Sequence, residues 1–262
     1  MNSLRGVYTI WYRDILRFWH DKIRLISATT FPLLFLFVFG SGLSARMGSL
    51  GAGVDFSQFI FPGIIGMSVL MSSFMAGVSV VWDREFGFLK EVLVAPISRV
   101  SVAVGKTLGA TTVALFQGML LLLFAPLIGV SLSIWTVLAL LPLMFLLAAS
   151  MGSLGILLAT RIRSMEAFQA TMQMLMFPMV FLSGVFFPLQ GLPAWMNILV
   201  KVNPATYGIA PIRQVILGAV PSSPFDINLL GHTMSLWENV AVVAAFGVAM
   251  LLLAMWSFGS QE

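Results

Sequence analysis

Cysteine is absent from the 262 residues, and histidine occurs only twice, at His20 and His232. Without thiols the chain forms no disulfide and offers no thiolate nucleophile or thiolate metal ligand. The two histidines are far apart in the sequence, and neither has a set of carboxylates beside it, so we expect no metal site. No arrangement of serine, histidine and acid suggests hydrolysis either, so no catalytic residue is assigned.

Charge is also scarce. Only 9% of the residues are charged, whereas soluble domains have about a quarter. Hydrophobic residues make up 59% of the chain and the mean hydropathy is +1.00. These values exclude an ordinary soluble domain and predict a multi-pass membrane protein. The net charge of +4 does not indicate nucleic-acid binding, because in a membrane protein the informative property is which loops carry Lys and Arg.

Six apolar segments are near or above the roughly 20 residues that a spanning helix needs. They lie at residues 25–43, 57–81, 102–128, 134–160, 166–189 and 238–258. The predicted fold class is therefore an all-α membrane protein with six transmembrane helices in one domain, residues 1–262.

The basic residues indicate the orientation of these segments. An inner N-terminus leaves three basic residues outside, Arg46, Lys201 and Arg213, and places the other eleven inside. The eleven are Arg5, Arg13, Arg17, Lys22, Arg24, Arg84, Lys90, Arg99, Lys106, Arg161 and Arg163. This distribution predicts that both termini are cytoplasmic.

Residues 1–24 precede the first apolar segment. Apolar side chains recur at helical spacing over residues 4–19, and most charges fall on the other face. Trp11, Arg13, Arg17 and Trp19 suit an interface helix at the headgroups of the inner leaflet. A plain solvated leader is the alternative, which the aromatic apolar face disfavours.

Residues 82–98 form a charged loop between the second and third apolar segments. Phe86, Leu89 and Leu93 share one face of a short helix, with most charges elsewhere. Pro96 ends that helix, and Ser98 or Ser101 caps the next one. We therefore predict a cytoplasmic amphipathic helix that contacts a partner outside the membrane.

Gly105-Lys106-Thr107 looks like the end of a phosphate-binding loop, but Val100 stands where the loop needs its first glycine. We therefore reject ATP binding and expect Lys106 to extend to the inner headgroups. The chain then depends on an outside energy source. The near absence of charge within the predicted spans argues against ion coupling, because ion-coupled carriers place ionisable residues at mid-membrane.

Prolines interrupt the apolar stretch between the fifth and sixth segments, leaving pieces too short to cross a bilayer. Pro193 and Pro204 are well placed to start two short helices, at 193–202 and 204–218. We expect residues 190–220 to form broken, re-entrant or interfacial half-helices on the outer side. A seventh crossing by residues 204–220 is the alternative, and it would place the C-terminus outside.

The fifth segment is rich in methionine and phenylalanine, which repack readily around apolar ligands. The candidate substrate path comprises Met172, Met176, Phe177, Phe181 and Phe186. Ordinary core filling or lipid contact is the alternative for these side chains.

Three stretches resemble the permease subunit of type-2 ATP-binding-cassette exporters, the family that includes drug-resistance and nodulation-factor permeases. They are FPGIIGMSVLMSSF (61–74) leading into residues 81–99 and GKTLGA (105–110), then SGVFFPLQGLPAWM (183–196), then VNPATYGIAPIRQVILG (202–218). The last departs from the family at Ala210-Pro211, where many relatives have an acidic residue, so an ion-pair role for Arg213 does not carry over.

The resemblance implies an inner- or plasma-membrane exporter of a hydrophobic or amphipathic substrate, such as a drug or lipid. Two copies, most simply a homodimer, would dock on two cytoplasmic ATPase subunits that bind ATP and Mg, while this chain binds no cofactor. The implied coupling residues are Asp83, Arg84, Glu85, Phe86, Leu89, Lys90 and Glu91. The implied outer gate contains Pro188, Pro193, Asn203, Pro204, Tyr207 and Arg213. Apart from the resemblance, Arg161, Arg163 and Glu166 in the short inner loop are a second candidate contact with the ATPase, and simple positive-inside anchoring is the alternative for them.

Two other functions stay open on the sequence. One is export of a lipid-linked polysaccharide or glycan by the same family. The other is a membrane scaffold without a transport path. We expect no nucleic-acid partner and no enzyme activity of this chain itself. Membrane lipids are expected partners.

Overall fold

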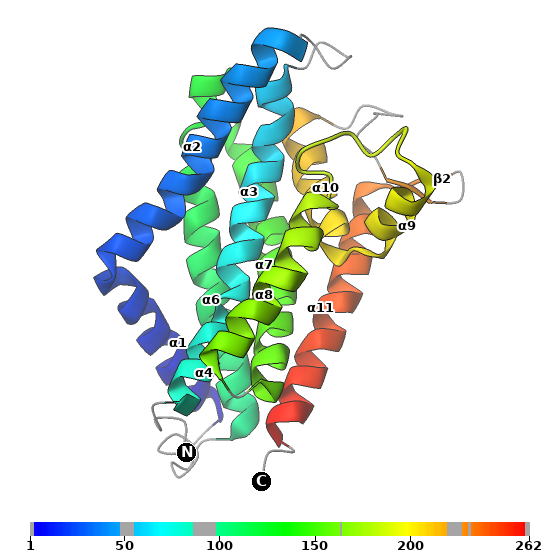
Figure 1. Ribbon diagram of the computed structural model, residues 1–262. Helices are drawn as coiled ribbons and strands as arrows, with labels where there is room; N and C mark the ends of the chain where they lie inside the picture. The colour runs from blue at the N-terminus through cyan, green and yellow to red at the C-terminus, as the bar shows by residue number, and fades with distance from the viewer. Residues whose placement is uncertain are drawn as a thin grey trace.

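The computed structural model describes residues 3–47, 55–85, 98–162, 164–218, 227–229 and 232–259, and helices dominate these residues (Figure 1). The α-helices are α1 (Ser3–His20), α2 (Lys22–Met47), α3 (Phe56–Phe74), α4 (Ala76–Glu85), α6 (Arg99–Leu122), α7 (Ile134–Arg161), α8 (Met165–Phe181), α9 (Ala194–Val202), α10 (Pro204–Leu217) and α11 (Leu236–Gly259). A 3-10 turn, η1, covers Ala125–Ile128. A small antiparallel hairpin pairs β1 (Asn228–Leu229) with β2 (His232–Thr233).

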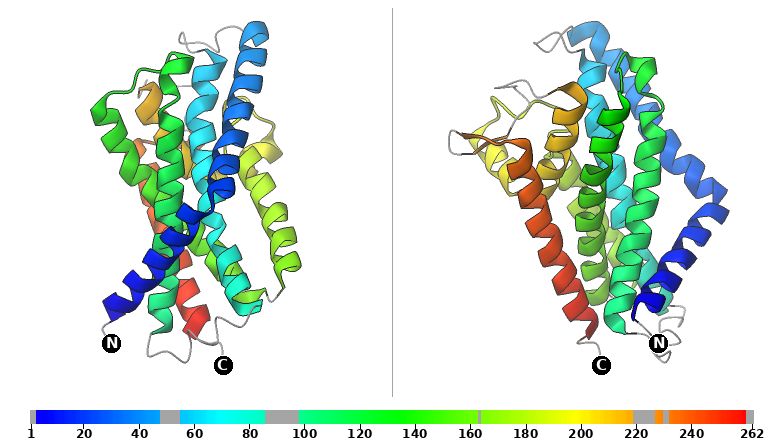
Figure 2. Two further views of the ribbon diagram at one scale, coloured as in Figure 1. Left: turned by 90° about the vertical axis from the view of Figure 1, so that its left-hand side faces the viewer. Right: turned by 180° about the vertical axis from the view of Figure 1, so that it is seen from behind.

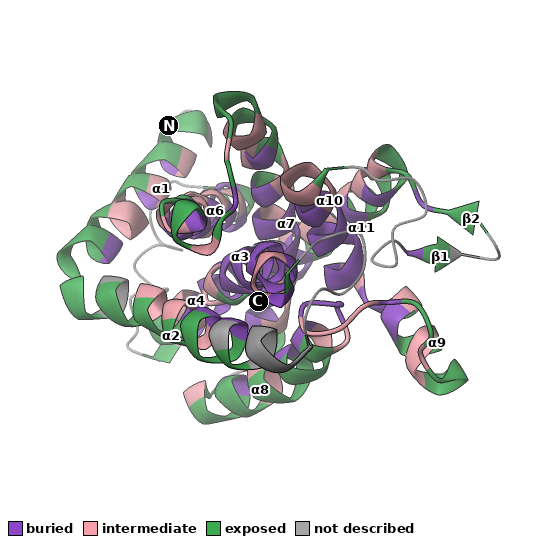
Figure 3. Ribbon diagram, turned by 90° about the horizontal axis from the view of Figure 1, so that it is seen from above, coloured by how far each residue is buried: buried purple, intermediate pink, exposed green. Residues whose placement is uncertain are grey.

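Helix α3 is the centre of the core. Nearly every residue of α3 is buried, as expected for a helix that is apolar on all sides. Figure 3 shows α3 in the middle of the bundle, with buried faces of α7 and α10 turned toward it and largely exposed α1, α2 and α8 around the outside. The bundle is therefore organised from α3 outward.

Helices α4 and α7 cross at two glycines. A methyl group added at Gly77 would lie 2.4 Å from the carbonyl oxygen of Gly155, and one added at Gly155 would lie 2.5 Å from that of Phe74. Only glycine permits backbones to approach this closely. The interruption between α3 and α4 falls at Met75, beside this crossing, where the Met75 amide donates to the carbonyls of Met71 and Ser73.

Three helical segments within the described residues are long and apolar enough to cross a membrane: Phe56–Glu85, Ile134–Arg161 and Leu236–Phe258. Helix α2 occupies the expected first segment. Helix α6 occupies the third but ends at Leu122 rather than at residue 128, because the chain turns there into η1. The fifth was expected to run to residue 189, but α8 ends at Phe181. That expectation is wrong because turns follow, with Gly184 and Gly191 at φ of +77° and +78°. Six crossings stay a prediction.

Both chain ends lie at one end of the bundle, here called the terminal end (Figure 1). Helices α4 and α7 finish there and α6 and α8 begin there, whereas α9 and the hairpin lie at the opposite, far end (Figures 1 and 2). Arg84 and Arg161, at the ends of α4 and α7, are thus at the terminal end, and Lys201 of α9 is at the far end. These three basic residues are divided between the two ends as predicted, and the orientation of the bundle in the membrane stays a prediction.

The two short helices expected after the fifth segment are α9 and α10, and their surroundings differ. Residues Ala205–Arg213 of α10 are all buried, and α10 contacts α3, α7 and α11. Most of α9 is partly or fully exposed, with Val200 its buried residue. A purely interfacial position is therefore wrong for α10, because neighbouring helices enclose it.

Candidate functional site

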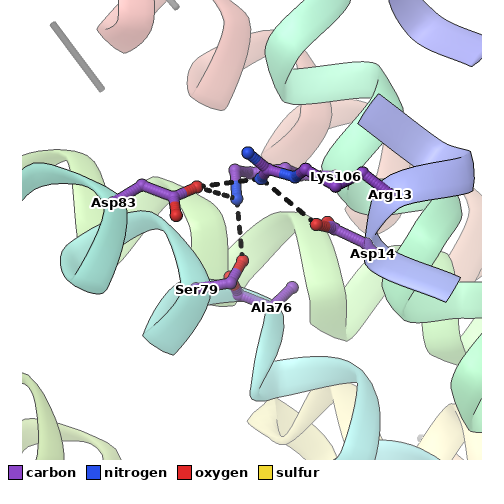
Figure 4. A network of polar contacts seen from close by, with 6 residues as sticks. All are labelled: Arg13, Asp14, Ala76, Ser79, Asp83 and Lys106. Atoms are coloured by element: carbon purple, nitrogen blue, oxygen red, sulfur yellow. Dashed lines mark hydrogen bonds and ion pairs between the residues drawn. The ribbon is translucent and has the colours of Figure 1, made fainter. Parts of the chain in front are cut away.

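Charged side chains from three helices meet at the terminal end, in a cluster that we call the ionic junction: Arg13, Asp14, Ser79, Asp83 and Lys106 (Figure 4). Lys106 Nζ of α6 lies 2.6 Å from Asp83 Oδ2 of α4 and 3.0 Å from Ser79 Oγ. Arg13 Nη2 of α1 lies 3.1 Å from the same Asp83 oxygen and 3.3 Å from Asp14 Oδ1. Two cations and two carboxylates thus balance one another.

The centre of the ionic junction is withdrawn from solvent. The Lys106 side chain is 2% exposed and that of Asp83 is 8% exposed. A buried charge persists only when it is paired and hydrogen-bonded, and here each ion provides the pairing for the other. The prediction that Lys106 extends to the headgroups is therefore wrong, because the Asp83 carboxylate is within reach inside the bundle.

Small residues of α6 bring α1 close enough to form this cluster. A methyl group at Gly105 would lie 2.9 Å from Ile10 Cβ, and one at Gly109 would lie 3.1 Å from Asp14 Cβ. Trp11 Nε1 of α1 also donates to Thr112 Oγ1 of α6, at 3.0 Å. The glycine of the phosphate-loop-like Gly105-Lys106-Thr107 therefore serves helix packing, at the spacing of a Gly-x-x-x-Gly contact.

The predicted cap of α6 is also in place. The Ser98 hydroxyl accepts from the Ser101 amide at 3.1 Å, and the two hydroxyls lie 2.7 Å apart. One of the two predicted caps, Ser98, is confirmed. It fixes the residue at which α6 begins.

Arg84 joins α4 to the carboxyl end of α7. Its guanidinium donates to the carbonyls of Ala159, Thr160 and Ile162, at 3.2, 3.3 and 3.1 Å. The last carbonyls of a helix lack intrahelical donors, and a cation there also suits the helix dipole. Arg84 therefore secures α4 to α7.

The predicted coupling residues divide into three groups. Asp83 and Arg84 face inward and bind helices of this chain, while Glu85 is exposed at the end of α4. The others, Phe86, Leu89, Lys90 and Glu91, lie outside the described residues. Contact with an ATPase stays a prediction.

Arg17 and Trp19 of the expected interface helix lie on α1. The Arg17 guanidinium is 5.5 Å from the Trp82 ring of α4, a cation–π contact. Trp19 is 58% exposed and packs edge-on against Phe116 of α6, with ring centroids 5.4 Å apart. This helix therefore packs against α4 and α6 and still presents aromatic surface outward.

The phenylalanines of the predicted substrate path form a row of rings that continues onto α2. Centroids lie 4.3 Å apart between Phe177 and Phe181, 4.9 Å between Phe181 and Phe186, and 5.3 Å between Phe186 and Phe35. Phe39 stacks on Phe35 at 4.2 Å. Phe35 and Phe39 were not among the predicted path residues; they lie four apart in the sequence and thus on one face of α2.

The methionines of that predicted path point differently from the phenylalanines. Met176 is 3% exposed and Met172 packs against the core, whereas Phe177 is 66% exposed. The five residues therefore do not share one face. Among the residues that the structure describes, no group of three histidine, cysteine or acidic side chains is arranged to hold a metal ion.

The predicted outer gate contains the start of α10. Asn203 Oδ1 accepts from the Ala205 amide at 3.1 Å, and Asn203 Nδ2 donates to the Met179 carbonyl of α8 at 2.7 Å. Pro204 opens the helix, and Tyr207 Oη donates to the Lys201 carbonyl at 2.6 Å. These contacts tie α8, α9 and α10 together.

Arg213 is buried inside the bundle at 3% exposure. Its Nη2 donates to the Gly184 carbonyl at 2.6 Å, and its guanidinium lies 4.4 Å from the Phe59 ring of α3. The two other predicted gate residues lie in the preceding turns, where Pro188 is partly buried and Pro193 caps α9. Gating by these residues stays a prediction.

The family model described as ABC-2 type transporter matches residues 5–217. This range begins in α1 and runs to the last residue of α10, and it contains the ionic junction and the predicted gate.

Three curated relatives align over most of the chain. A ycf38 transport permease of Cyanophora paradoxa is 32% identical over 88% of this chain and 81% of its own length. The inner membrane transport permease YadH of Escherichia coli K12 is 29% identical, covering 80% and 82%. The daunorubicin resistance ABC transporter permease protein DrrB1 of Streptomyces coeruleorubidus is 24% identical, covering 93% and 84%.

Proposed function

Because this chain belongs to the ABC-2 type transporter permease family, we propose that it forms the membrane path of an exporter driven by separate ATPase subunits. Relatives named as transport permeases, one of them for daunorubicin resistance, support a transport role. The substrate that we propose is hydrophobic or amphipathic, and the assembly is two permease copies with two ATPases. The terminal end is then the cytoplasmic end.

The ends of α11 support a membrane position for the bundle. Trp237 and Trp256, near the two ends of α11, are 77% and 64% exposed. At 1.5 Å per residue they are about 28 Å apart along the axis, close to the roughly 30 Å of a hydrocarbon core. Tryptophans favour both membrane interfaces, so α11 suits a full crossing. We propose six crossings, with α2, α6 and α8 joining the three segments that are long and apolar enough to cross a membrane.

The ionic junction is the observation that carries the coupling proposal. A force that the ATPases apply to the segment after Glu85 is transmitted directly to α4. Asp83 connects α4 to α6 through Lys106 and to α1 through Arg13, and Arg84 connects it to α7. These contacts make the four helices respond together, so that closure of the ATPases rocks one face of the bundle.

The row of phenylalanines supports a path beside α8. Phe177 and Phe181 are 66% and 42% exposed, on the outside of the bundle where α8 and α2 face each other. Such adaptable aromatic surface fits a substrate that is apolar and variable in shape. We propose that substrate leaves between two protomers along this face.

The test is ATP-dependent uptake of daunorubicin by inverted membrane vesicles that contain this chain and the ATPase that copurifies with it. Glu85→Gln together with Glu91→Gln removes two charges from the proposed coupling segment. We expect uptake to fall severalfold while the amount of inserted permease stays constant. Glu238→Gln, which changes a carboxylate at the far end, is the matched control.

Unchanged uptake in the double variant would refute the coupling role of these carboxylates. Purification without any ATPase, together with no stimulation of ATP hydrolysis, would instead support the scaffold function.

A further inference from the structure

A cavity of about 300 Å³ opens at the terminal end, between α1, α4, α6 and α8. This volume is at the lower end of the roughly 300–1,000 Å³ range of small-molecule pockets. Its apolar wall includes Phe18, Met75 and Val113, and its polar wall includes residues of the ionic junction. An amphiphile is the kind of ligand that such a divided surface suits.

Lys106 supplies a buried cation to this cavity. Its ammonium carries three N–H donors. Asp83 and Ser79 accept two of them, at 2.6 and 3.0 Å, and the side chain is 2% exposed. One donor thus stays available on a buried charged group that lines the cavity. A donor of this kind favours an anionic oxygen, and a phosphate provides several.

One face of α1 supplies charges of both signs opposite this donor. Asp14, Arg17 and Asp21 follow one another three and four residues apart, so they lie along one side of the helix and its end. Arg17 is also held over the Trp82 ring, at 5.5 Å, and both line the cavity. Each positive group therefore has a carboxylate close by in the sequence or in space.

The charges that line the cavity sum to zero, with Arg17 and Lys106 opposing Asp14 and Asp21. The two carboxylates would repel a ligand with an excess of negative charge, and the two basic side chains would repel a simple cation. A headgroup that joins a phosphate to an ammonium places each charge beside an opposite one. Balanced walls therefore favour a zwitterion.

We propose that this cavity binds the zwitterionic phosphate–ammonium headgroup of an amphiphile from the adjacent leaflet. The phosphate accepts from Lys106 and Arg17, and the ammonium lies near Asp14 and Asp21. The acyl chains extend along the apolar wall toward the middle of the bundle. The idea that the cavity is an entry site for cargo rests on the proposed export function. Binding of the headgroup to the cavity can be measured without any transport.

The experiment is calorimetric titration of the detergent-purified full chain with dihexanoylphosphatidylethanolamine. Dihexanoylphosphatidylglycerol, which keeps the phosphate but lacks the ammonium, is the comparison ligand. Arg17→Gln and Lys106→Met remove the two cations in turn. Arg161→Gln is the matched control, because Arg161 also lies over a tryptophan, Trp256 at 5.7 Å, but does not line the cavity.

We expect the ethanolamine lipid to bind wild type at least about fivefold more tightly than the glycerol lipid. Binding should weaken about threefold in Arg17→Gln, whose side chain is exposed, and about tenfold or more in Lys106→Met, since buried charge-assisted bonds are the stronger ones. Arg161→Gln should bind as wild type does. Equal affinity for the two lipids refutes the preference for a zwitterionic headgroup. Binding by Arg17→Gln with the affinity of wild type refutes the assignment of the binding site to this cavity.

The source of the ligand follows from a second measurement on the complex reconstituted with its ATPase. Stimulation of ATP hydrolysis by the ethanolamine lipid identifies it as cargo. Binding without stimulation identifies a resident bilayer lipid. Both results are consistent with the proposed binding site. If the expected differences in affinity between the two lipids and between wild type and the variants are not found, the binding site is refuted even if export is observed.

Discussion

Replacing Asp83 by Asn tests whether the ionic junction holds α1, α4 and α6 together. The substitution keeps the size of the side chain and an oxygen that can accept a hydrogen bond, but it removes the counterion of Lys106, whose side chain is 2% exposed. Leaving a buried charge without its counterion costs about 3–5 kcal/mol, which corresponds to a lowering of Tm on the order of 10 °C for a chain of this size.

Two further variants make this a double-mutant cycle. Lys106→Met should cost less, about 1–3 kcal/mol, because Asp83 still has Arg13 at 3.1 Å. The combined Asp83→Asn and Lys106→Met variant should be more stable than Asp83→Asn alone, since no uncompensated buried ammonium is left.

Thermal unfolding of the detergent-purified protein, followed by tryptophan fluorescence and by size-exclusion profiles of heated samples, provides the measurement. An Asp83→Asn variant with the Tm of wild type would refute the reasoning. So would a double variant whose loss equals the sum of the two single losses, because the two side chains would then not interact.

Three other predictions concern stability. Gly77→Ala should destabilise by about 1–3 kcal/mol, since its methyl group would overlap the backbone of α7, whereas Gly42→Ala, with nothing within 4 Å, should not lower Tm. Asn203→Ala should cost about 1–2 kcal/mol by removing the cap of α10, more than Ser133→Ala, whose bond is 3.4 Å long and exposed; Tm values of the pair decide this. Arg84→Gln should speed amide hydrogen exchange at the carboxyl ends of α4 and α7. If the exchange rates there equal those of wild type, Arg84 does not secure α4 to α7.

Much of the helical framework was predictable because it follows from composition and periodicity. The runs of apolar residues placed α7 and α11 near their true bounds, and Pro193 and Pro204 marked the two short helices. They did not reveal that the second segment divides at Met75 into α3 and α4. The end of α8 was not predictable in this way. Hydropathy continues past Phe181, and the turns there contain Gly184 at a φ of +77°. Its carbonyl accepts from Arg213 of α10, a contact between residues 29 apart in the sequence.

The candidate site was only partly predictable, for a different reason. The Lys106–Asp83 pair joins residues 23 apart in the sequence, so no local pattern reveals it. A usable signal was nevertheless present. Gly105 and Gly109 mark a face of α6 for close packing, and a helix with an acidic and a basic residue at this level, α1, was available to occupy it.

The buried lysine also bears on how the chain enters its membrane during synthesis. Lys106 stands about 10 Å into α6 from Arg99 at 1.5 Å per residue. A lysine at the centre of an inserting helix costs about 2.5–3.5 kcal/mol, and Lys106, which lies before the centre of α6, costs less than this. Asp83 leaves the ribosome first, because α4 precedes α6 in the chain. Asp83 is therefore already synthesised when Lys106 emerges, so its carboxylate is available to pair with the lysine as α6 inserts.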